Sequence, residues 1–379
     1  MADVAIIGGG LSGLYAAHLL TQQGLRYSLF EARPDTGGRL LSLSAQEMAS
    51  AGEGTGISRG PTDRFDLGAT WFWPDRQRQL GALVSGLGLK PFAQPDAGDW
   101  VLERSQRAPL QRVRGSPTSA PSMRLAGGMA SLVQAVQQRL DSSCLHLSHQ
   151  VTAVTLCENS VAVQTRFNSV STTWHATRLL LALPPRLAAE SIRFFPALPP
   201  DVSGAWLNTP TWMASHAKYL AVFDEPFWRA DGLAGAAQSA VGPMVEVQDA
   251  SSPSGHAALF GFIGVPAQAR AGIDHSDMLS GCRAQLVRLF GERAARPVAE
   301  TLLDWAQEPF TATARDQVAS GHATAPAASV VRGPWENRIF GTASEWSPEF
   351  PGYIAGAVDA AQRAVDAVVR ALSAQSASS

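Results

Sequence analysis

Charged residues are scarce in this sequence. Asp, Glu, Lys and Arg make up 16% of the 379 residues, against about 25% in an average globular protein. The 30 basic and 32 acidic residues nearly cancel, so the formal net charge is −2. A chain this close to neutral has no strong field to attract nucleic acid or an anionic membrane. We therefore expect neither of these partners.

Cysteine is also rare. Cys144, Cys157 and Cys282 stand far apart and form no Cys-x-x-Cys pair, which argues against a disulfide framework and a zinc ribbon. The eight histidines show neither His-x-His nor His-Glu-x-x-His spacing, so we expect no metal site. Few, unpaired cysteines fit a reducing compartment, and we predict a cytoplasmic protein.

Long apolar runs and a P-loop are absent as well. No run approaches the ~18 residues of a membrane-spanning helix, and the apolar run at residues 4–7 is too short for the core of a signal peptide. No glycine precedes a lysine, so the Gly-Lys-Ser/Thr of a P-loop cannot occur. Any nucleotide site must therefore use another pattern.

Such a pattern begins at the N-terminus. The short apolar run predicts a buried parallel strand, and the spacing Gly-x-Gly-x-x-Gly follows at Gly8, Gly10 and Gly13, before a helical stretch, a second strand and Glu31. In such a unit the glycines allow a tight turn, a close approach of backbone to pyrophosphate, and close packing of helix on strand. The acidic residue accepts hydrogen bonds from ribose hydroxyls. We predict a dinucleotide site here.

A second glycine turn follows the second strand, which we predict over residues 27–30. Gly37 and Gly38 precede Arg39, a pattern that NAD binding does not require. It suits a second stretch of backbone along an extended dinucleotide, with the guanidinium of Arg39 neutralising the diphosphate. A further apolar strand then runs into another glycine turn, over residues 65–71.

With these turns in place, the chain resembles the FAD-dependent amine oxidase family of monoamine, polyamine and L-amino-acid oxidases. The matching segments beyond the first glycine turns, in the family's order, are Phe-Asp-Leu-Gly-Ala-Thr-Trp (65–71), Leu-Ala-Leu-Pro-Pro (181–185), and residues 217–228, 304–310 and 345–357. The resemblance implies FAD rather than NAD. It also implies an α/β fold, in which a Rossmann-like FAD-binding domain is interleaved with a smaller α+β substrate domain built on a mixed sheet.

The resemblance also implies where the two domains lie. The FAD-binding domain would comprise residues 1–75, 122–190 and 302–379, and the substrate domain residues 76–121 and 191–301. Within the first domain, apolar periodicity predicts an amphipathic helix over 129–140 and a hairpin of strands 151–154 and 161–163.

Cofactor-binding positions follow from the matched motifs. The backbone of Val151 would contact the adenine, and Glu345 would lie near the ribityl chain or the phosphates. The full set that the resemblance implies for FAD is Gly8, Gly10, Ser12, Gly13, Glu31, Arg33, Gly38, Arg39, Leu40, Gly68, Ala69, Thr70, Trp71, Val151, Glu345, Tyr353 and Ile354.

Lysine is nearly missing, which makes each lysine informative. Of the 30 basic residues only Lys90 and Lys218 are lysines, and Lys218 falls where the family keeps a lysine that reaches flavin N5 through a water. Residues 217–223 predict a strand buried on both faces, where a lysine needs a partner or a function. The pKa of an ammonium falls readily on burial, so we expect Lys218 to assist when reduced flavin meets oxygen. The alternative is a lysine that snorkels to solvent from the strand end.

Members of the family often stand two aromatic rings on the flavin. Tyr353 matches one ring, and Trp305 matches a tryptophan beside the flavin. The second ring would fall within residues 311–315, which contain no aromatic residue. This half of the pair is therefore missing or comes from elsewhere, with Trp346 and Phe350 as candidates. Ala314 stands where some members carry the cysteine that binds flavin covalently, and we expect noncovalent FAD.

The region between Trp71 and Gly128 is short compared with the helical cap of longer members. Its prolines favour loops. We therefore expect a trimmed cap and a more open entrance to the active site. Arg104, Arg112 and Arg315 are candidates to clamp a substrate carboxylate. His216, two residues before Lys218, is a candidate to line the pocket.

We therefore expect an oxidase that takes a hydride from the carbon next to an amine. Its products would be an imine that hydrolyses to an aldehyde and ammonia, and hydrogen peroxide from oxygen. Lys218, Tyr353 and Trp305 would be the catalytic residues. Two alternatives with the same fold stay open: an amino-acid oxidase, and a dehydrogenase or desaturase with another electron acceptor. A third, a flavoprotein without turnover that serves as a binding or regulatory module, is disfavoured by the presence of Lys218, Trp305 and Tyr353. The expected partners are a small-molecule amine and molecular oxygen, and the chain would be a monomer or a homodimer.

Overall fold

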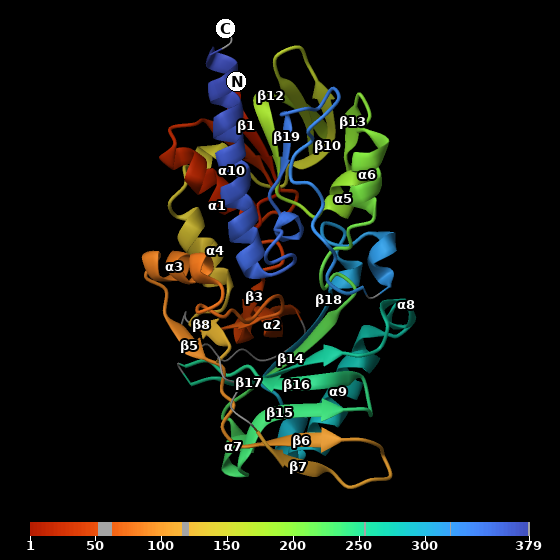
Figure 1. Ribbon diagram of the computed structural model, residues 1–379. Helices are drawn as coiled ribbons and strands as arrows, with labels where there is room; N and C mark the ends of the chain where they lie inside the picture. The colour runs from red at the N-terminus through yellow and green to blue at the C-terminus, as the bar shows by residue number, and fades with distance from the viewer. Residues whose placement is uncertain (52–62, 116–120, 254, 319, 378–379) are drawn as a thin grey trace.

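Two large sheets stand at opposite ends of an elongated molecule, and the N- and C-termini lie together beyond the first sheet (Figure 1). The computed structural model describes residues 1–51, 63–115, 121–253, 255–318 and 320–377. Among these residues, no helix combines the length and the apolar composition that crossing a membrane requires.

The first sheet has eight strands in the order β13-β10-β11-β12-β1-β2-β9, with β19 beside β12. Strands β9, β2, β1, β12 and β19 run parallel, and β10 and β11 form an antiparallel hairpin that joins β12. The bounds are β1 (Ala2–Ile7), β2 (Tyr27–Phe30), β9 (Leu145–His146), β10 (Gln150–Leu156), β11 (Val161–Phe167), β12 (Val170–Leu181), β13 (Arg193–Phe195) and β19 (Ile339–Gly341).

Helices cover both faces of this sheet. On one face lie α1 (Leu11–Gln22), α3 (Arg78–Gly86), α4 (Ala130–Gln137) and α10 (Ile354–Ala377), and on the other α5 (Pro185–Ser191) and α6 (Pro200–Leu207) (Figure 1). Because side chains alternate along a strand, neighbouring leucines of β12 enter different cores: Leu180 packs against α1 and α10, and Leu179 and Leu181 pack on the opposite side.

The second sheet has seven strands in the order β18-β14-β17-β16-β15-β6-β7. Its pairs are antiparallel except for β15 with β6, so the sheet is mixed. Helix α9 (His275–Phe290) packs on one face. The strand bounds are β6 (Asp99–Glu103), β7 (Gln111–Arg114), β14 (Ala217–Phe223), β15 (Leu233–Ser239), β16 (Met244–Asp249), β17 (Ala257–Ile263) and β18 (Ala299–Asp304).

The remaining elements are short. The strands are β3 (Ser42–Ser44), β4 (Arg64–Asp66), β5 (Pro91–Ala93) and β8 (Met123–Leu125), and the helices are α2 (Ala45–Ala51), α7 (Phe227–Ala230) and α8 (Ala267–Arg270). The single 3₁₀ turns are η1 (Ser142–Cys144), η2 (Glu292–Ala295), η3 (Trp305–Gln307), η4 (Ala314–Gln317) and η5 (Ser344–Trp346).

The structure confirms the α/β fold with its mixed second sheet and most of the predicted elements. The predicted strands at 27–30 and 217–223 are β2 and β14, the hairpin is β10–β11, and the helix at 129–140 is the shorter α4. The prediction of loops between Trp71 and Gly128 was wrong, because that region holds α3 and strands β5 to β8.

The predicted domain boundaries stay a prediction, and two strands cross them. Strand β18 joins the second sheet and extends past residue 302, while β13, from the 191–301 segment, pairs with β10 in the first sheet. Pairing partners far apart in the chain thus decide which sheet a strand joins.

Substitution of a core leucine tests this packing. Leu20 on α1 is fully buried, so Leu20→Ala leaves a cavity and should lower the free energy of unfolding by about 2–5 kcal/mol. Leu110 is 39% exposed, and Leu110→Ala should change it by less than about 0.5 kcal/mol. Urea titration of both variants measures the difference, and equal effects would contradict the assigned core.

Candidate active site

The turn between β1 and α1 forms the first wall of a deep cavity. Gly8 has a φ of 109°, which favours glycine. A Cβ on Gly8 would collide with the carbonyl oxygen of Ala182, and a Cβ on Gly13 with that of Gly8. Gly10 caps α1 without any side-chain hydrogen bond, so the N–H groups of the first helical turn remain available to a phosphate.

A second glycine turn lies directly against the first. Gly37 N–H donates to the carbonyl of Gly9 at 2.9 Å, and Gly10 and Gly37 form an isolated parallel bridge. Gly37 and Gly38 both have positive φ values, 120° and 58°, and a Cβ on Gly10 would meet nothing closer than 3.9 Å. The two turns therefore present bare backbone to the cavity.

Arg39, which follows these glycines, forms a bidentate ion pair. Its Nη1 and Nη2 lie 2.6 and 3.0 Å from the two carboxylate oxygens of Glu345. Burial raises the pKa of Glu345, but the guanidinium outweighs it, and the net shift is downward. Arg39 also donates to the Ser344 hydroxyl at 3.3 Å, so its charge is balanced within the protein.

Glu31 lies at the end of β2, as predicted, and holds the turn in place. Its carboxylate accepts from Gly9 N–H at 2.6 Å and from Arg33 N–H at 2.8 Å. The guanidinium of Arg33 in turn reaches Glu308 at 3.0 Å and Thr311 at 3.1 Å. A chain of hydrogen bonds thus runs from the end of β2 to residues 308–311 after β18.

Lys218 enters the cavity from β14, in which every residue is buried. The ammonium donates to Thr70 Oγ1 at 2.7 Å and to the Gly68 carbonyl at 3.2 Å, and lies 3.9 Å from the centre of the Phe260 ring. Burial lowers the pKa of Lys218 to about 7, with Asp66 opposing the shift and Arg124 adding to it. With 2% exposure, Lys218 does not snorkel.

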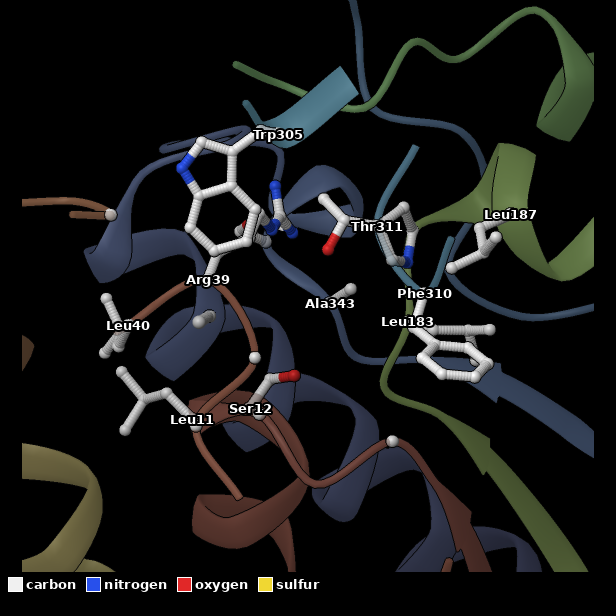
Figure 2. A pocket seen from close by; sticks show the side chains of 18 of the residues that line it. Leu11, Ser12, Arg39, Leu40, Leu183, Leu187, Trp305, Phe310, Thr311 and Ala343 are labelled. Carbon is white, nitrogen blue, oxygen red and sulfur yellow. Dashed lines mark hydrogen bonds between the residues drawn. The ribbon is translucent and has the colours of Figure 1, made fainter. Parts of the chain in front are cut away.

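Aromatic residues frame the same space. Trp305 is buried, and its indole N–H donates to the Leu67 carbonyl at 3.1 Å. Tyr353 is 38% exposed, with Trp73 edge-on to it at 6.4 Å. Figure 2 shows Ser12 at the start of α1 on one side of the cavity, Trp305 on the opposite side, and Phe310 at a further end beside Leu183.

One cavity of about 400 Å³ joins these parts. It brings together every residue of the predicted FAD set except Gly13 and Glu345, which lie behind it, as well as Lys218, Trp305 and the candidate His216. The two glycine turns and the helix N-terminus at this cavity fit a dinucleotide.

Several lining residues were not identified from the sequence. They are Trp73, His149, Gln150, Leu183, Leu187, Trp212, Met213, Phe262, Phe310 and Ser344. A signal existed for Leu183, which belongs to the matched Leu-Ala-Leu-Pro-Pro segment. None existed for Trp212 or Phe262, which resemble ordinary core residues until the chain is folded.

Other predicted candidates lie elsewhere. Arg315 is exposed and pairs with Glu190 at 3.1 Å, and Arg104 and Arg112 bond at the surface of the second sheet. None of these arginines, and none of the three cysteines, is among the described residues that line the cavity. The cavity thus offers no thiol to bind a flavin.

Comparison with known protein families agrees with this geometry. Residues 6–87 match the family described as "NAD(P)-binding Rossmann-like domain", and residues 97–369 match "Flavin containing amine oxidoreductase". The second match covers well over half of the chain.

Curated relatives align over nearly the whole chain. The flavin-containing amine oxidase B of Cavia porcellus is 22% identical, over 98% of this chain and 86% of the relative. A putative flavin-containing monoamine oxidase of Mycobacterium tuberculosis is 26% identical, over 98% of this chain and 97% of the relative.

Solved structures share the fold. Putrescine oxidase bound to putrescine superposes with a TM-score of 0.76 at 20% identity, covering 97% of this chain and 99% of that one. Cyclohexylamine oxidase from Brevibacterium oxydans superposes with a TM-score of 0.79 at 20% sequence identity, covering 98% of this chain and 99% of that one. Together with the cavity at the two glycine turns, these matches lead to one conclusion: the chain belongs to the flavin-containing amine oxidoreductase family, whose cofactor is FAD and whose reaction is the oxidation of amines.

Proposed function

We propose that this enzyme is an oxidase that acts on a small-molecule amine, with molecular oxygen as its electron acceptor and FAD held noncovalently. When bound, FAD accepts the hydride that leaves the carbon next to the amine nitrogen, and oxygen then takes the electrons and gives hydrogen peroxide. The observation that carries the proposal is Lys218, a fully buried lysine whose ammonium faces the cavity beside Thr70.

Lys218 serves the oxygen step in this proposal. An ammonium in a water-poor site stabilises the negative charge that develops on oxygen as it is reduced. Thr70 and the Gly68 carbonyl use two of its three N–H donors, which fixes its position. Among the described residues these are the two acceptors bonded to the ammonium, which leaves the third N–H to hold a water or an oxygen species.

The lining of the cavity favours a neutral amine. Glu31 is the one carboxylate among the described lining residues, and its oxygens accept from the Gly9 and Arg33 backbones. No free carboxylate therefore retains the substrate as an ammonium ion. The neutral form has the lone pair that supports loss of a hydride from the adjacent carbon, and Trp305 and Tyr353 supply apolar walls that orient it.

An amino-acid substrate is less well supported. Arg33 and Arg39 line the cavity, but both guanidiniums are paired with carboxylates, Glu308 and Glu345. No arginine among the described lining residues is left to clamp a substrate carboxylate. We therefore favour an amine without a carboxylate group.

The setting of the enzyme completes the proposal. We place FAD in the domain built on the first sheet and substrate recognition on the second, with the boundaries given by the sequence motifs. Three free cysteines fit the reducing cytoplasm, and we propose a monomer or a homodimer.

Replacement of Lys218 tests the oxygen step. Lys218→Met removes the ammonium, and we expect reoxidation of the reduced flavin by oxygen to slow by about 10²-fold, measured by stopped-flow absorbance. Lys90→Met, at the only other lysine and in an exposed position, is the matched control and should leave the rate unchanged. Equal rates in both variants would refute the role of Lys218.

The pH dependence of the same step provides a second test. Because the pKa of Lys218 is about 7, the ammonium predominates below that pH and is lost above it. The reoxidation rate should therefore fall as pH rises through about 7, and Lys218→Met should abolish this transition. A wild-type rate that rises with pH would indicate that the neutral amine of Lys218 is the active form.

Anaerobic mixing identifies the substrate class. Pools of primary amines, polyamines and amino acids are mixed with the yellow protein, and the visible flavin band is followed. We expect one amine pool to bleach it, and air to restore it with one hydrogen peroxide formed for each amine oxidised. Bleaching without peroxide would indicate a dehydrogenase, and bleaching by amino acids alone would overturn the preferred substrate class.

A further inference from the structure

A carboxylate is buried in the segment that holds the lysine of the cavity. Asp66, the last residue of β4, stands two positions before the Gly68 carbonyl that accepts from Lys218, and it is 3% exposed. Its Oδ1 accepts from the Ser42 hydroxyl at 2.6 Å and from the Met129 N–H at 2.7 Å. Its Oδ2 is buried and has no hydrogen-bond partner among the described residues. One oxygen of this carboxylate is therefore fixed, and the other carries charge that no hydrogen bond from these residues satisfies.

A guanidinium is buried within the reach of the same charge. Arg124 on β8 is also 3% exposed, and its Nη groups donate to the carbonyls of Ala250 at 2.8 Å and Ser251 at 3.0 Å. Its Nε has no partner in the described part of the chain. Because carbonyl groups are neutral, they satisfy hydrogens of Arg124 without balancing its charge. Burial lowers the pKa of Arg124, and the carboxylates of Asp66 and Asp249 oppose this shift.

Of these two carboxylates, that of Asp249 is already paired. It accepts from the guanidinium of Arg229 at 2.8 Å, which leaves Asp66 to balance Arg124. Asp66 is also the acid that favours the ammonium form of Lys218, while Arg124 disfavours it. A single carboxylate thus serves two buried cations.

The strands that flank β14 add no charge at this point. Strands β17 and β18 place Phe262 and Leu303 opposite Lys218, and among the described residues the charges that act on this lysine are those of Asp66 and Arg124. With Lys218 neutral, the carboxylate and the guanidinium cancel. With Lys218 protonated, the buried group has a net positive charge, which a low-dielectric interior disfavours.

We propose that Asp66 is a counter-ion shared by two buried cations, Arg124 and Lys218, and that this sharing decides whether the lysine holds its proton when oxygen is reduced. Neither Asp66 nor Arg124 is among the described residues that line the cavity, so both are positioning residues that act through Lys218. The proposal rests on the proposed function only in assigning the oxygen step to Lys218. Loss of the carboxylate should favour the neutral amine, and loss of the guanidinium should favour the ammonium.

A purely structural role of Asp66 is the alternative. Gly128 has a φ of 72°, and a Cβ there would meet Asp66 Oδ1 at 2.9 Å, so the segment before α4 packs closely on this carboxylate. Asp66→Asn separates the two roles, because an asparagine carbonyl oxygen in the place of Oδ1 still accepts from Ser42 and Met129. The hydrogen bonds are kept and the charge is lost.

The scarcity of lysine makes the protonation of Lys218 directly measurable by NMR. In FAD-loaded protein produced with lysine carrying ¹³C at Cε, Lys90 and Lys218 are the two labelled residues, and Lys218→Met assigns their signals. We expect the Lys218 signal to titrate near pH 7, and Asp66→Asn to move the midpoint down by about one pH unit. Asp277→Asn, at an exposed acid on α9, is the matched control and should leave the midpoint unchanged.

Arg124→Met should move the same midpoint up by about one pH unit, because Asp66 then balances Lys218 alone. A general loss of packing would not shift two variants in opposite directions. Arg107→Met, at an exposed arginine between β6 and β7, is the control for this variant. Where Arg124→Met fails to fold, Asp66→Asn decides alone, and an unchanged midpoint in Asp66→Asn would overturn the proposal.

Reoxidation of flavin reduced by light follows the oxygen step without any amine. At pH 7 the rate should fall about fivefold in Asp66→Asn and rise about twofold in Arg124→Met, in line with the fraction of ammonium at each shifted midpoint. In both variants the pH at which the rate changes should follow the NMR midpoint.

The two readouts distinguish the two claims. If the midpoints shift in opposite directions but the reoxidation rate does not follow them, the shared counter-ion stands and the assignment of the oxygen step to Lys218 is wrong. If reoxidation depends on Lys218 but both variants titrate as wild type, the counter-ion is wrong and the proposed function stands.

Discussion

The turn at residues 67–70 connects the two halves of the molecule, and the geometry of the active site depends on it. From the second sheet, Lys218 donates to the Gly68 carbonyl and Thr70, and Trp305 donates to the Leu67 carbonyl. From the first, Leu67 and Gly68 donate to the Leu41 carbonyl, and Gly68 lies so close to the Arg39 carbonyl that no Cβ fits. Because this turn is hydrogen-bonded to both halves of the molecule, it fixes the distance between Lys218 and the glycine turns of the first half.

Charge in the site is arranged so that little of it is unpaired. Arg33 and Arg39 each have a carboxylate partner, which leaves Lys218 as the cation whose protonation is set by burial. With a pKa of about 7, Lys218 can be either a charged ammonium or a neutral amine near neutral pH. Arginine supplies 28 of the 30 basic side chains, and a guanidinium stays charged in every setting, whereas the charge of a buried lysine can change.

The sequence predicted those parts of the site that are governed by local rules. Gly8, Gly10, Gly13 and Glu31 follow a fixed spacing imposed by backbone sterics, and the structure places them as that spacing requires. Trp212 and His322 follow no such rule: they are 110 positions apart in the chain, and only the tertiary fold brings them together with Tyr353. Helix α3 was missed because proline-rich neighbours obscured a short amphipathic segment with two buried residues, Leu80 and Val84.

The order of the cavity walls along the chain has a consequence for biosynthesis. Gly8 and Ser12 emerge from the ribosome first, Ala182 and Lys218 midway, and Tyr353 and Ile354 near the end. Helix α10, which follows these last two, packs on α1. An unfinished chain therefore cannot enclose the cofactor, however well its first βαβ unit has folded. A chain that retains the yellow colour through purification must therefore include α10.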